Sequence, residues 1–221
     1  MIFSVKKFIL QAFLPSILVW IYLTTFRQIR SLTLRILILP LIILLLIGSS
    51  YYSVAKIGDG DSRYAVESLS ETAKATAYDI RFQTGRDAGS GYTLGELDGT
   101  FQSMLRLAPS SINVSLFRPY LWEVSNPLML LTAIESFIFL ILVIIIFFRH
   151  GFGILKVFQN PDISFCLIFT LIYAFAVGVS SFNFGTLARY KIPLMPFFAL
   201  AIVLIYNENK PRKLDELEMT E

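Results

Sequence analysis

Five long apolar runs constrain the fold of this chain more than any other feature. A helix rises about 1.5 Å per residue and the hydrocarbon core of a bilayer is about 30 Å thick, so a crossing helix needs about 20 apolar residues. Most of the runs reach that length, and they cover residues 8–26, 34–55, 127–148, 163–182 and 187–206. Backbone amides in lipid must be hydrogen-bonded within their own segment, and the runs lack the alternation of a barrel strand. The pattern predicts an all-α membrane protein with about five transmembrane helices.

The runs divide the chain into four parts. Residues 1–55 hold two predicted transmembrane helices, residues 56–126 form a polar domain, residues 127–206 hold three further helices, and residues 207–221 are a charged tail. An apolar content of 55% and a mean hydropathy of +0.66 exceed what the core of a soluble protein of this length requires. The lipid bilayer is therefore the first partner that the sequence predicts.

Lysine and arginine residues predict how the chain is oriented in the membrane. In the short loops and the C-terminal tail, eight of them lie on one side of the predicted bilayer and four on the other. The side richer in positive charge is normally cytoplasmic, so the tail is predicted inside and the 56–126 domain outside. Lys6 and Lys7 oppose this orientation and resemble the start of a signal peptide, but the bulky residues 22–26 offer no cleavage site. We therefore expect the first run to be retained as a span.

The outer domain is predicted to combine helices with a glycine-rich loop. Asp61 or Ser62 can cap a helix that ends near Phe82, and a second short helix is predicted over residues 100–107. Glycines recur through residues 84–99, but their spacing matches no phosphate-binding loop and no strand precedes them. A plain loop is therefore favoured over a ligand cradle.

Charge and cysteine content exclude several classes of function. The net charge of +3 is small and is tied to topology, so nucleic acid is not a predicted partner. Cys166 is the single cysteine and lies within a predicted helix, which excludes an intrachain disulfide and a cysteine metal site. The sequence predicts neither a metal nor a cofactor.

The segment before the third run is rich in aromatic residues with polar edges. Tyr120, Trp122 and Glu123 are interleaved there with aliphatic residues, and such rings prefer the headgroup layer of a bilayer. We expect residues 110–126 to lie along the outer interface. Arg118, Trp122 and Glu123, in the same segment, either face a lipid-linked substrate or anchor the following helix.

Glu135 is the one acidic residue inside the predicted third helix, about 12 Å from its outer end. A carboxylate at that depth is costly unless it is paired, protonated or hydrated, so it indicates either a functional residue or a packing ion pair. Arg189 and Lys191, at the outer end of the last run, are its predicted partners.

The string NFGTLARYKIPLMP at residues 183–196 is the most specific in the chain. Arg189 can bind a phosphate or a carboxylate through its planar guanidinium, Tyr190 suits the interface, and Lys191 adds a second cation. These three residues and Arg118 form the predicted lipid-phosphate site.

The end of that string, RYKIPLMP, opens the last span. Together with LFRPYLWE at residues 116–123 and AIES at residues 133–136, it resembles the C-terminal part of bacterial multispanning inner-membrane proteins of surface-polysaccharide pathways, including GT-C glycosyltransferases. The resemblance covers about residues 100–206. It implies an inner-membrane protein of glycan assembly that handles a polyprenyl-phosphate lipid.

Two functions follow from this resemblance, and a small transporter is a weaker third because the chain has no obvious inverted repeat. The first is an auxiliary, non-catalytic component of polysaccharide or lipid-linked glycan assembly, working with another membrane subunit. The second is a fragment or relative of a GT-C glycosyltransferase, in which Asp59, Asp61 or Glu135 acts as acid or base. GT-C enzymes place an acidic residue in the first outer loop of a longer bundle, whereas Asp59 and Asp61 follow the second run here.

Overall fold

The computed structural model describes two long parts of the chain and several short ones. The long parts are residues 100–151 and 157–208, and residues 2–28 and 90–95 are described as well. Isolated positions complete the set: 40–41, 44–45, 48, 71, 73–75, 78–79 and 98. The described residues form helices and one isolated antiparallel bridge between Gly91 and Asn183.

From α4 onward the described helices follow one another closely along the chain. In order they are α1 (Ile2–Gln28), α4 (Phe101–Arg106), α5 (Ala108–Phe117), η3 (Leu121–Glu123), α6 (Pro127–His150), α7 (Pro161–Ser180), α8 (Phe184–Tyr190), η5 (Ile192–Leu194) and α9 (Met195–Asn207).

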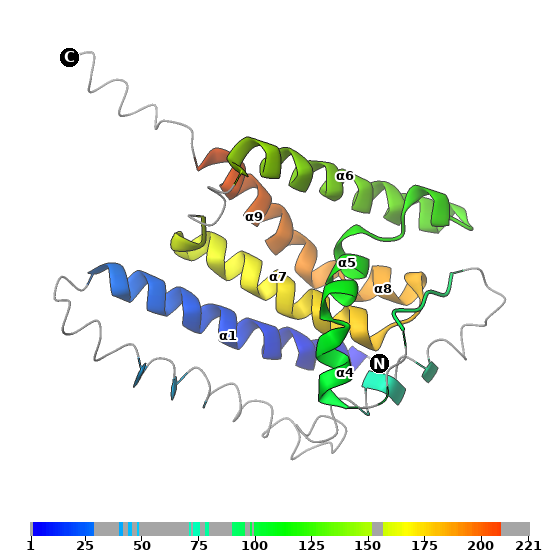
Figure 1. The fold of residues 1–221 in the computed structure, drawn as a ribbon, viewed down its shortest axis with the longest axis horizontal. Helices are drawn as coiled ribbons and strands as arrows, with labels where there is room; N and C mark the ends of the chain where they lie inside the picture. The colour runs from blue at the N-terminus through cyan, green and yellow to red at the C-terminus, as the bar shows by residue number, and fades with distance from the viewer. Residues whose placement is uncertain are drawn as a thin grey trace, which may run out of the picture.

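Four long helices lie side by side in the order α1, α7, α9, α6 (Figure 1). α1, α6 and α9 run in one direction and α7 runs in the other. α4 and α5 cross the bundle at the end where α6 begins, and α5 packs against both α6 and α7. We call this the outer end of the bundle, and the opposite end the inner end.

Two of the described helices, α6 and α7, are long and apolar enough to cross a membrane. The pair formed by α8 and α9 makes a third candidate if it crosses as one bent unit, and the apolar stretch found in α1, Ala12–Thr25, is shorter. The all-α class is therefore confirmed for the described residues, which include apolar helices of membrane-crossing length. The second predicted span, 34–55, lies largely outside the described residues.

Asparagine caps start three of these helices. The side-chain oxygens of Asn126, Asn160 and Asn183 accept hydrogen bonds from amides of the first turns of α6, α7 and α8, at 2.8, 3.1 and 2.8 Å. Pro127 and Pro161 follow two of the caps, where a missing amide hydrogen costs nothing. The cap at Asn160 starts α7 two residues before the predicted run.

The last predicted span is a broken helix. α8 ends at Tyr190, α9 begins at Met195, and the two helical parts are bent by 41°. Pro193 and Pro196 have no amide hydrogen to donate to the preceding turn, which explains why a continuous helix is interrupted there. The break separates the environments of Arg189 and Lys191.

α7 is the centre of the core. Phe169 is buried between Phe13 of α1 and Phe197 of α9, with ring centroids 6.3 and 4.3 Å away. At the inner end, the indole nitrogen of Trp20 donates a 2.7 Å hydrogen bond to the Asp162 carboxylate. These contacts attach α1 and α9 to opposite sides of α7.

α5 approaches α7 closely because the facing residues are small. A methyl group added at Gly178 would overlap the backbone carbonyl of Ser111, and the Ser115 hydroxyl donates a 2.7 Å hydrogen bond to the carbonyl of Ala174. Small residues allow such close approach between membrane helices. The prediction that residues 110–126 lie along the interface is therefore wrong for its first half, which is a helix packed into the bundle.

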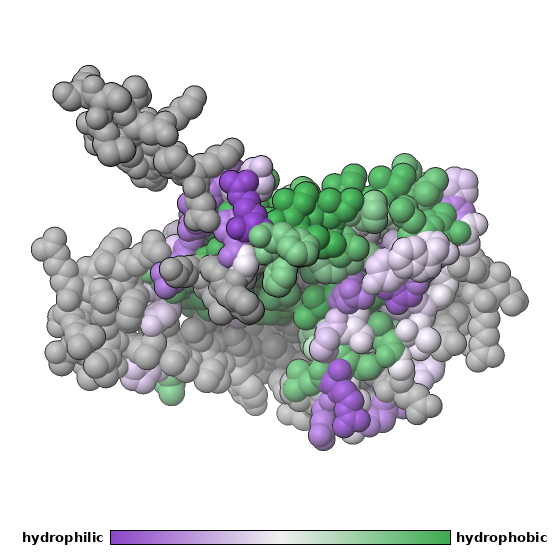
Figure 2. Space-filling view, turned by 45° about the horizontal axis from the view of Figure 1, so that its top comes forward, coloured by the Kyte–Doolittle hydropathy of each residue, from purple (hydrophilic) through white to green (hydrophobic). Residues whose placement is uncertain are grey.

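α6 buries little of its surface. Only 17% of its apolar window is buried, against 61% for α7, and Leu128 and Phe148 near its two ends are each 80% exposed. Figure 2 shows a band of hydrophobic residues over this helix with hydrophilic residues at both ends. Such a band matches the surface that a bilayer or another membrane helix would cover.

Candidate functional site

A pocket of about 370 Å³ lies at the outer end of the bundle, between α6 and α8. Its lining residues come from three parts of the chain: Ser90, Asn126, Leu128, Met129, Leu131, Thr132, Phe184, Gly185, Ala188 and Arg189. The α6 wall is mainly apolar, whereas Ser90, Asn126 and Thr132 add polar atoms. The pocket therefore has the mixed lining that an amphiphile needs.

Arg189 supplies the positive charge of this pocket. It lies in the last turn of α8, is exposed, and forms no ion pair with any described residue. The Asn183 cap fixes the start of this short helix, with hydrogen bonds to the amides of Gly185 and Thr186 at 2.8 and 3.2 Å. A guanidinium held on a capped helix can bind a phosphate or a carboxylate through two hydrogen bonds.

Lys191 is in a different environment from Arg189, although only one residue separates them. Lys191 is 1% exposed, and its Nζ donates a 3.0 Å hydrogen bond to the hydroxyl of Ser136. The same nitrogen lies 3.7 Å from Oε1 of Glu135. A buried ammonium needs such partners, so Lys191, and not Arg189, is the cation that pairs with Glu135 among the described residues.

Ser136 connects this ion pair to the segment before α6. Its hydroxyl donates a 3.2 Å hydrogen bond to the backbone carbonyl of Arg118 while accepting one from Lys191. Ser136 is fully buried, whereas the side chain of Glu135 is 45% exposed. Ser136 was not among the residues predicted from the sequence, where its only signal is a hydroxyl next to an acidic residue inside an apolar run.

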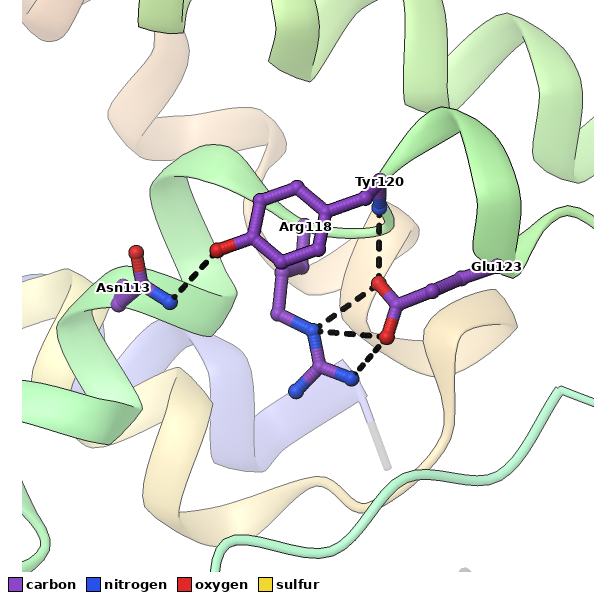
Figure 3. A network of polar contacts seen from close by, with 4 residues as sticks. All are labelled: Asn113, Arg118, Tyr120 and Glu123. Carbon is purple, nitrogen blue, oxygen red and sulfur yellow. Dashed lines mark hydrogen bonds and ion pairs between the residues drawn. The ribbon is translucent and has the colours of Figure 1, made fainter.

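Arg118 is held by a network of its own (Figure 3). Its Nε donates hydrogen bonds to both carboxylate oxygens of Glu123, at 3.1 and 3.0 Å, and its Nη2 forms an ion pair with the same group. The Tyr120 amide donates a 2.8 Å hydrogen bond to Glu123, and the Asn113 amide donates a 3.2 Å hydrogen bond to the Tyr120 hydroxyl. The network joins α5 to η3.

Aromatic rings surround the same guanidinium. The Arg118 Cζ lies 5.7 Å from the ring centre of Tyr92, 5.8 Å from that of Tyr120 and 5.2 Å from that of Phe184. These distances are within the range of cation–π attraction. Because Phe184 also lines the pocket, Arg118 supports one wall of the pocket from behind.

Electrostatics strengthen the Arg118–Glu123 pair. Burial opposes ionisation of Glu123, but hydrogen bonds from Arg118 and the Tyr120 amide, with the Arg118 charge, hold its pKa below the ordinary value. The hydrogen bond to Glu123 likewise raises the pKa of Arg118, against the effect of burial. Both groups therefore stay charged at neutral pH.

A short segment from the outer domain closes one side of the site. We call residues 90–94 the outer strap. The Tyr92 amide donates to the carbonyl of Phe182 at 3.0 Å, the Phe184 amide donates to the carbonyl of Ser90 at 2.9 Å, and the Tyr92 hydroxyl donates to the carbonyl of Ser181. Burial raises the pKa of the Tyr92 hydroxyl, so it remains a donor. The strap thereby brings Ser90 into the pocket lining.

The remaining predicted site residues lie at the edges of this region or beyond it. Trp122 is 80% exposed and stacks on Tyr120 with ring centres 4.8 Å apart, as suits a residue at the membrane interface. Tyr190 is half-buried on α8. Asp59 and Asp61 lie outside the described residues.

The described residues offer no cluster of three or more His, Cys, Asp or Glu side chains that could hold a metal. Comparison with known proteins gives no relative, because no family model, curated protein or solved structure matches the chain.

Proposed function

We propose that the protein is an integral membrane protein that binds a phosphate-bearing lipid in the pocket between α6 and α8. The lipid is of the polyprenyl-phosphate class, and the protein is an auxiliary, non-catalytic component of surface-polysaccharide or lipid-linked glycan assembly in a bacterial inner membrane. The observation that carries the proposal is Arg189, an exposed arginine on the wall of a pocket whose α6 side is apolar.

The charges around the pocket favour Arg189 as the phosphate ligand. Lys191 is buried and neutralises Glu135, and Arg118 is engaged by Glu123 and by three rings. Neither has an exposed head group to offer to a lipid at the membrane surface. In this proposal Lys191 and Arg118 position the two helices, and Arg189 binds the anion.

The proposed topology has five spans with the outer end of the bundle outside the cytoplasm. The helix directions support it, because α1, α6 and α9 run from the outer to the inner end and α7 returns (Figure 1). The strap, α4, α5 and η3 then belong to the extracytoplasmic domain at 56–126, and the predicted span 34–55 supplies the second return. A phosphate bound by Arg189 would lie at the level of the outer headgroups.

The test is mass spectrometry of the detergent-purified full chain with its bound lipids retained. The wild-type chain is expected to carry a polyprenyl-phosphate species, and Arg189→Ala is expected to lose it, because a charge-assisted bidentate contact is removed. Arg106→Ala is the matched control, since Arg106 is an exposed arginine of α4 that does not line the pocket. Ala188→Trp, which fills the pocket without changing charge, is expected to act like Arg189→Ala.

Two results would contradict the proposal. The first is bulk phospholipid alone in both the wild-type and Arg189→Ala samples. The second is equal loss of the lipid in Arg189→Ala and Arg106→Ala, which would indicate general electrostatic attraction and not a site.

A further inference from the structure

One stripe of exposed residues on α6 has the spacing of a helix-packing surface. Leu131, Glu135, Ile138, Leu142 and Ile145 follow one another at intervals of four, three, four and three residues. The four apolar residues are each at least 37% exposed, and the side chain of Glu135 is 45% exposed. We call these five residues the α6 seam. Alternation of three and four keeps a stripe facing one neighbour when two helices cross at about +20°, the commonest arrangement in membrane bundles.

Glu135 distinguishes this stripe from the other exposed faces of α6. Lys191 is its one cationic neighbour among the described residues. The Nζ of Lys191 is buried and lies 3.7 Å from Oε1 of Glu135. The contact with Lys191 is this ion pair, and 45% of the Glu135 side chain is still exposed. A carboxylate about 12 Å along an apolar helix loses hydration that one ion pair replaces only in part. The outward side of Glu135 therefore needs a hydrogen-bond donor.

We propose that the α6 seam binds one transmembrane helix of a different membrane protein, and that this helix carries a lysine, arginine or amide side chain at the depth of Glu135. The apolar members of the seam supply packing, and the carboxylate fixes the register, as a single polar residue does in a coiled-coil seam. This interaction is independent of the lipid proposed for the pocket.

Charge complementarity argues against a second copy as the occupant. In a parallel two-fold pair of α6 helices, the two Glu135 carboxylates would lie at the same level of the contact. Like charges that face each other across an interface are unfavourable, whereas a different helix can present a complementary group.

Photo-crosslinking in the native membrane tests this proposal with the full chain. A benzophenone side chain is introduced at Ile138 or Leu142 in the seam, and at Phe137 or Ile141 as controls that are also exposed but off the seam. The seam positions are expected to yield one protein product of a single mass, and the off-seam positions to yield lipid adducts. Sequencing of the crosslinked peptide is expected to show an apolar helix with a lysine, arginine, asparagine or glutamine within one turn of the attachment point.

Two substitutions test whether the crosslinked product depends on the α6 seam. Glu135→Leu is expected to lower the crosslinking yield about tenfold, because an interhelical polar contact contributes about 1–2 kcal/mol. Since that change also leaves Lys191 without its carboxylate, Leu142→Trp provides a second variant that blocks the seam from outside. Ile141→Trp is its control and is expected to keep the yield.

Three outcomes of the crosslinking itself would overturn the proposal. These are lipid adducts alone at the seam positions, a product that joins two copies of this chain, and a partner helix without a donor near the crosslink. Equal loss of yield with Leu142→Trp and Ile141→Trp would also overturn it, because packing would then not follow the seam.

Discussion

α6 and α7 are both apolar helices of membrane-crossing length, yet they occupy opposite places in the fold. α6 is the more hydropathic of the two, but α7 buries 61% of its apolar window and α6 buries 17%. α7 carries small residues such as Ser164, Ala174 and Gly178 along its buried faces, whereas α6 is filled with leucine, isoleucine and phenylalanine. Between lipid and protein interior, apolarity alone gives no preference, so close packing by small residues decides which helix is central.

The largest loss of stability is expected when the close contact between α5 and α7 is removed. Gly178→Leu places a side chain where the Ser111 carbonyl lies, and is expected to lower the free energy of unfolding by about 3 kcal/mol or more. Ile144→Trp, an enlargement on the exposed surface of α6, is expected to change it by less than about 0.5 kcal/mol. Unfolding by SDS titration in mixed micelles measures both. Similar losses would show that α6 is as tightly packed as α7.

Matched truncations of phenylalanine give the next largest effect. Phe169→Ala in α7 is expected to lower the free energy of unfolding by about 2 kcal/mol, the cavity part of such a change, because the transfer part is small between lipid and protein. Phe148→Ala in α6 removes a side chain that is 80% exposed and is expected to cost less than about 0.5 kcal/mol. The same titration compares the two variants, and an equal cost would contradict the difference in burial.

Arg118→Met is expected to loosen the outer end of α6 without disturbing α7. It leaves the Glu123 carboxylate without its cation, and both side chains are only about one-fifth exposed, so a loss of about 1–2 kcal/mol is expected. Hydrogen exchange should rise in the first half of α6, which includes Ser136 and its hydrogen bond to the Arg118 carbonyl, and stay slow in α7. Arg149→Met at the inner end is the control. Faster exchange throughout α7 would contradict the local role.

Acid should loosen the same junction. The pKa of Glu123 is lower in the folded chain than its ordinary value of 4.5, so the unfolded chain binds the proton more readily. The stabilisation is therefore complete above about pH 4.5 and is lost as the pH falls through the lower folded value. Fluorescence anisotropy of Trp122, in a Trp20→Phe background, should fall over that acidic range. Glu123→Gln should remove the pH dependence, and a transition unchanged in that variant would assign it to another group.

The smallest effect is expected at Asp98, which belongs to neither helix. Its carboxylate accepts hydrogen bonds from the amide and the hydroxyl of Thr100, at 2.8 and 2.7 Å, and bonds of the Ser103 and Thr100 side chains lower its pKa to about 2. Asp98→Ala should increase hydrogen exchange in α4 alone. A change in α6 or α7 would show that α4 transmits strain to the bundle.

The sequence was sufficient for features that depend on one segment. The apolar runs at 127–148 and 163–182 correspond to α6 and α7 within two residues at each end, because length and hydropathy act locally. The contact between Glu135 and Lys191 could also be predicted from the sequence, since a carboxylate inside a span needs a nearby cation.

Features that depend on two distant segments were not predictable in the same way. The burial of α5 requires that Ser111 and Ser115 pack against Gly178 and Ala174. Neither segment contains a sequence pattern that identifies the other as its packing partner. The pairing of Arg118 with Glu123 depends on how the chain turns between α5 and η3. The sequence alone therefore predicts only that both residues lie at the membrane interface. The different burial of Arg189 and Lys191 follows from the bend after α8. The proline positions predict that the helix is interrupted there, but they do not predict the angle of the bend.

The close contact at Gly178 also bears on how the chain is made. α5 leaves the ribosome well before α7, so the surface on which Ser111 and Ser115 pack does not yet exist when they are synthesised. Until α7 has been inserted, the Ser115 hydroxyl lacks the Ala174 carbonyl to which it donates in the folded chain. The contact between α5 and α7 therefore forms only after the later segment has been made, although α5 itself is synthesised first.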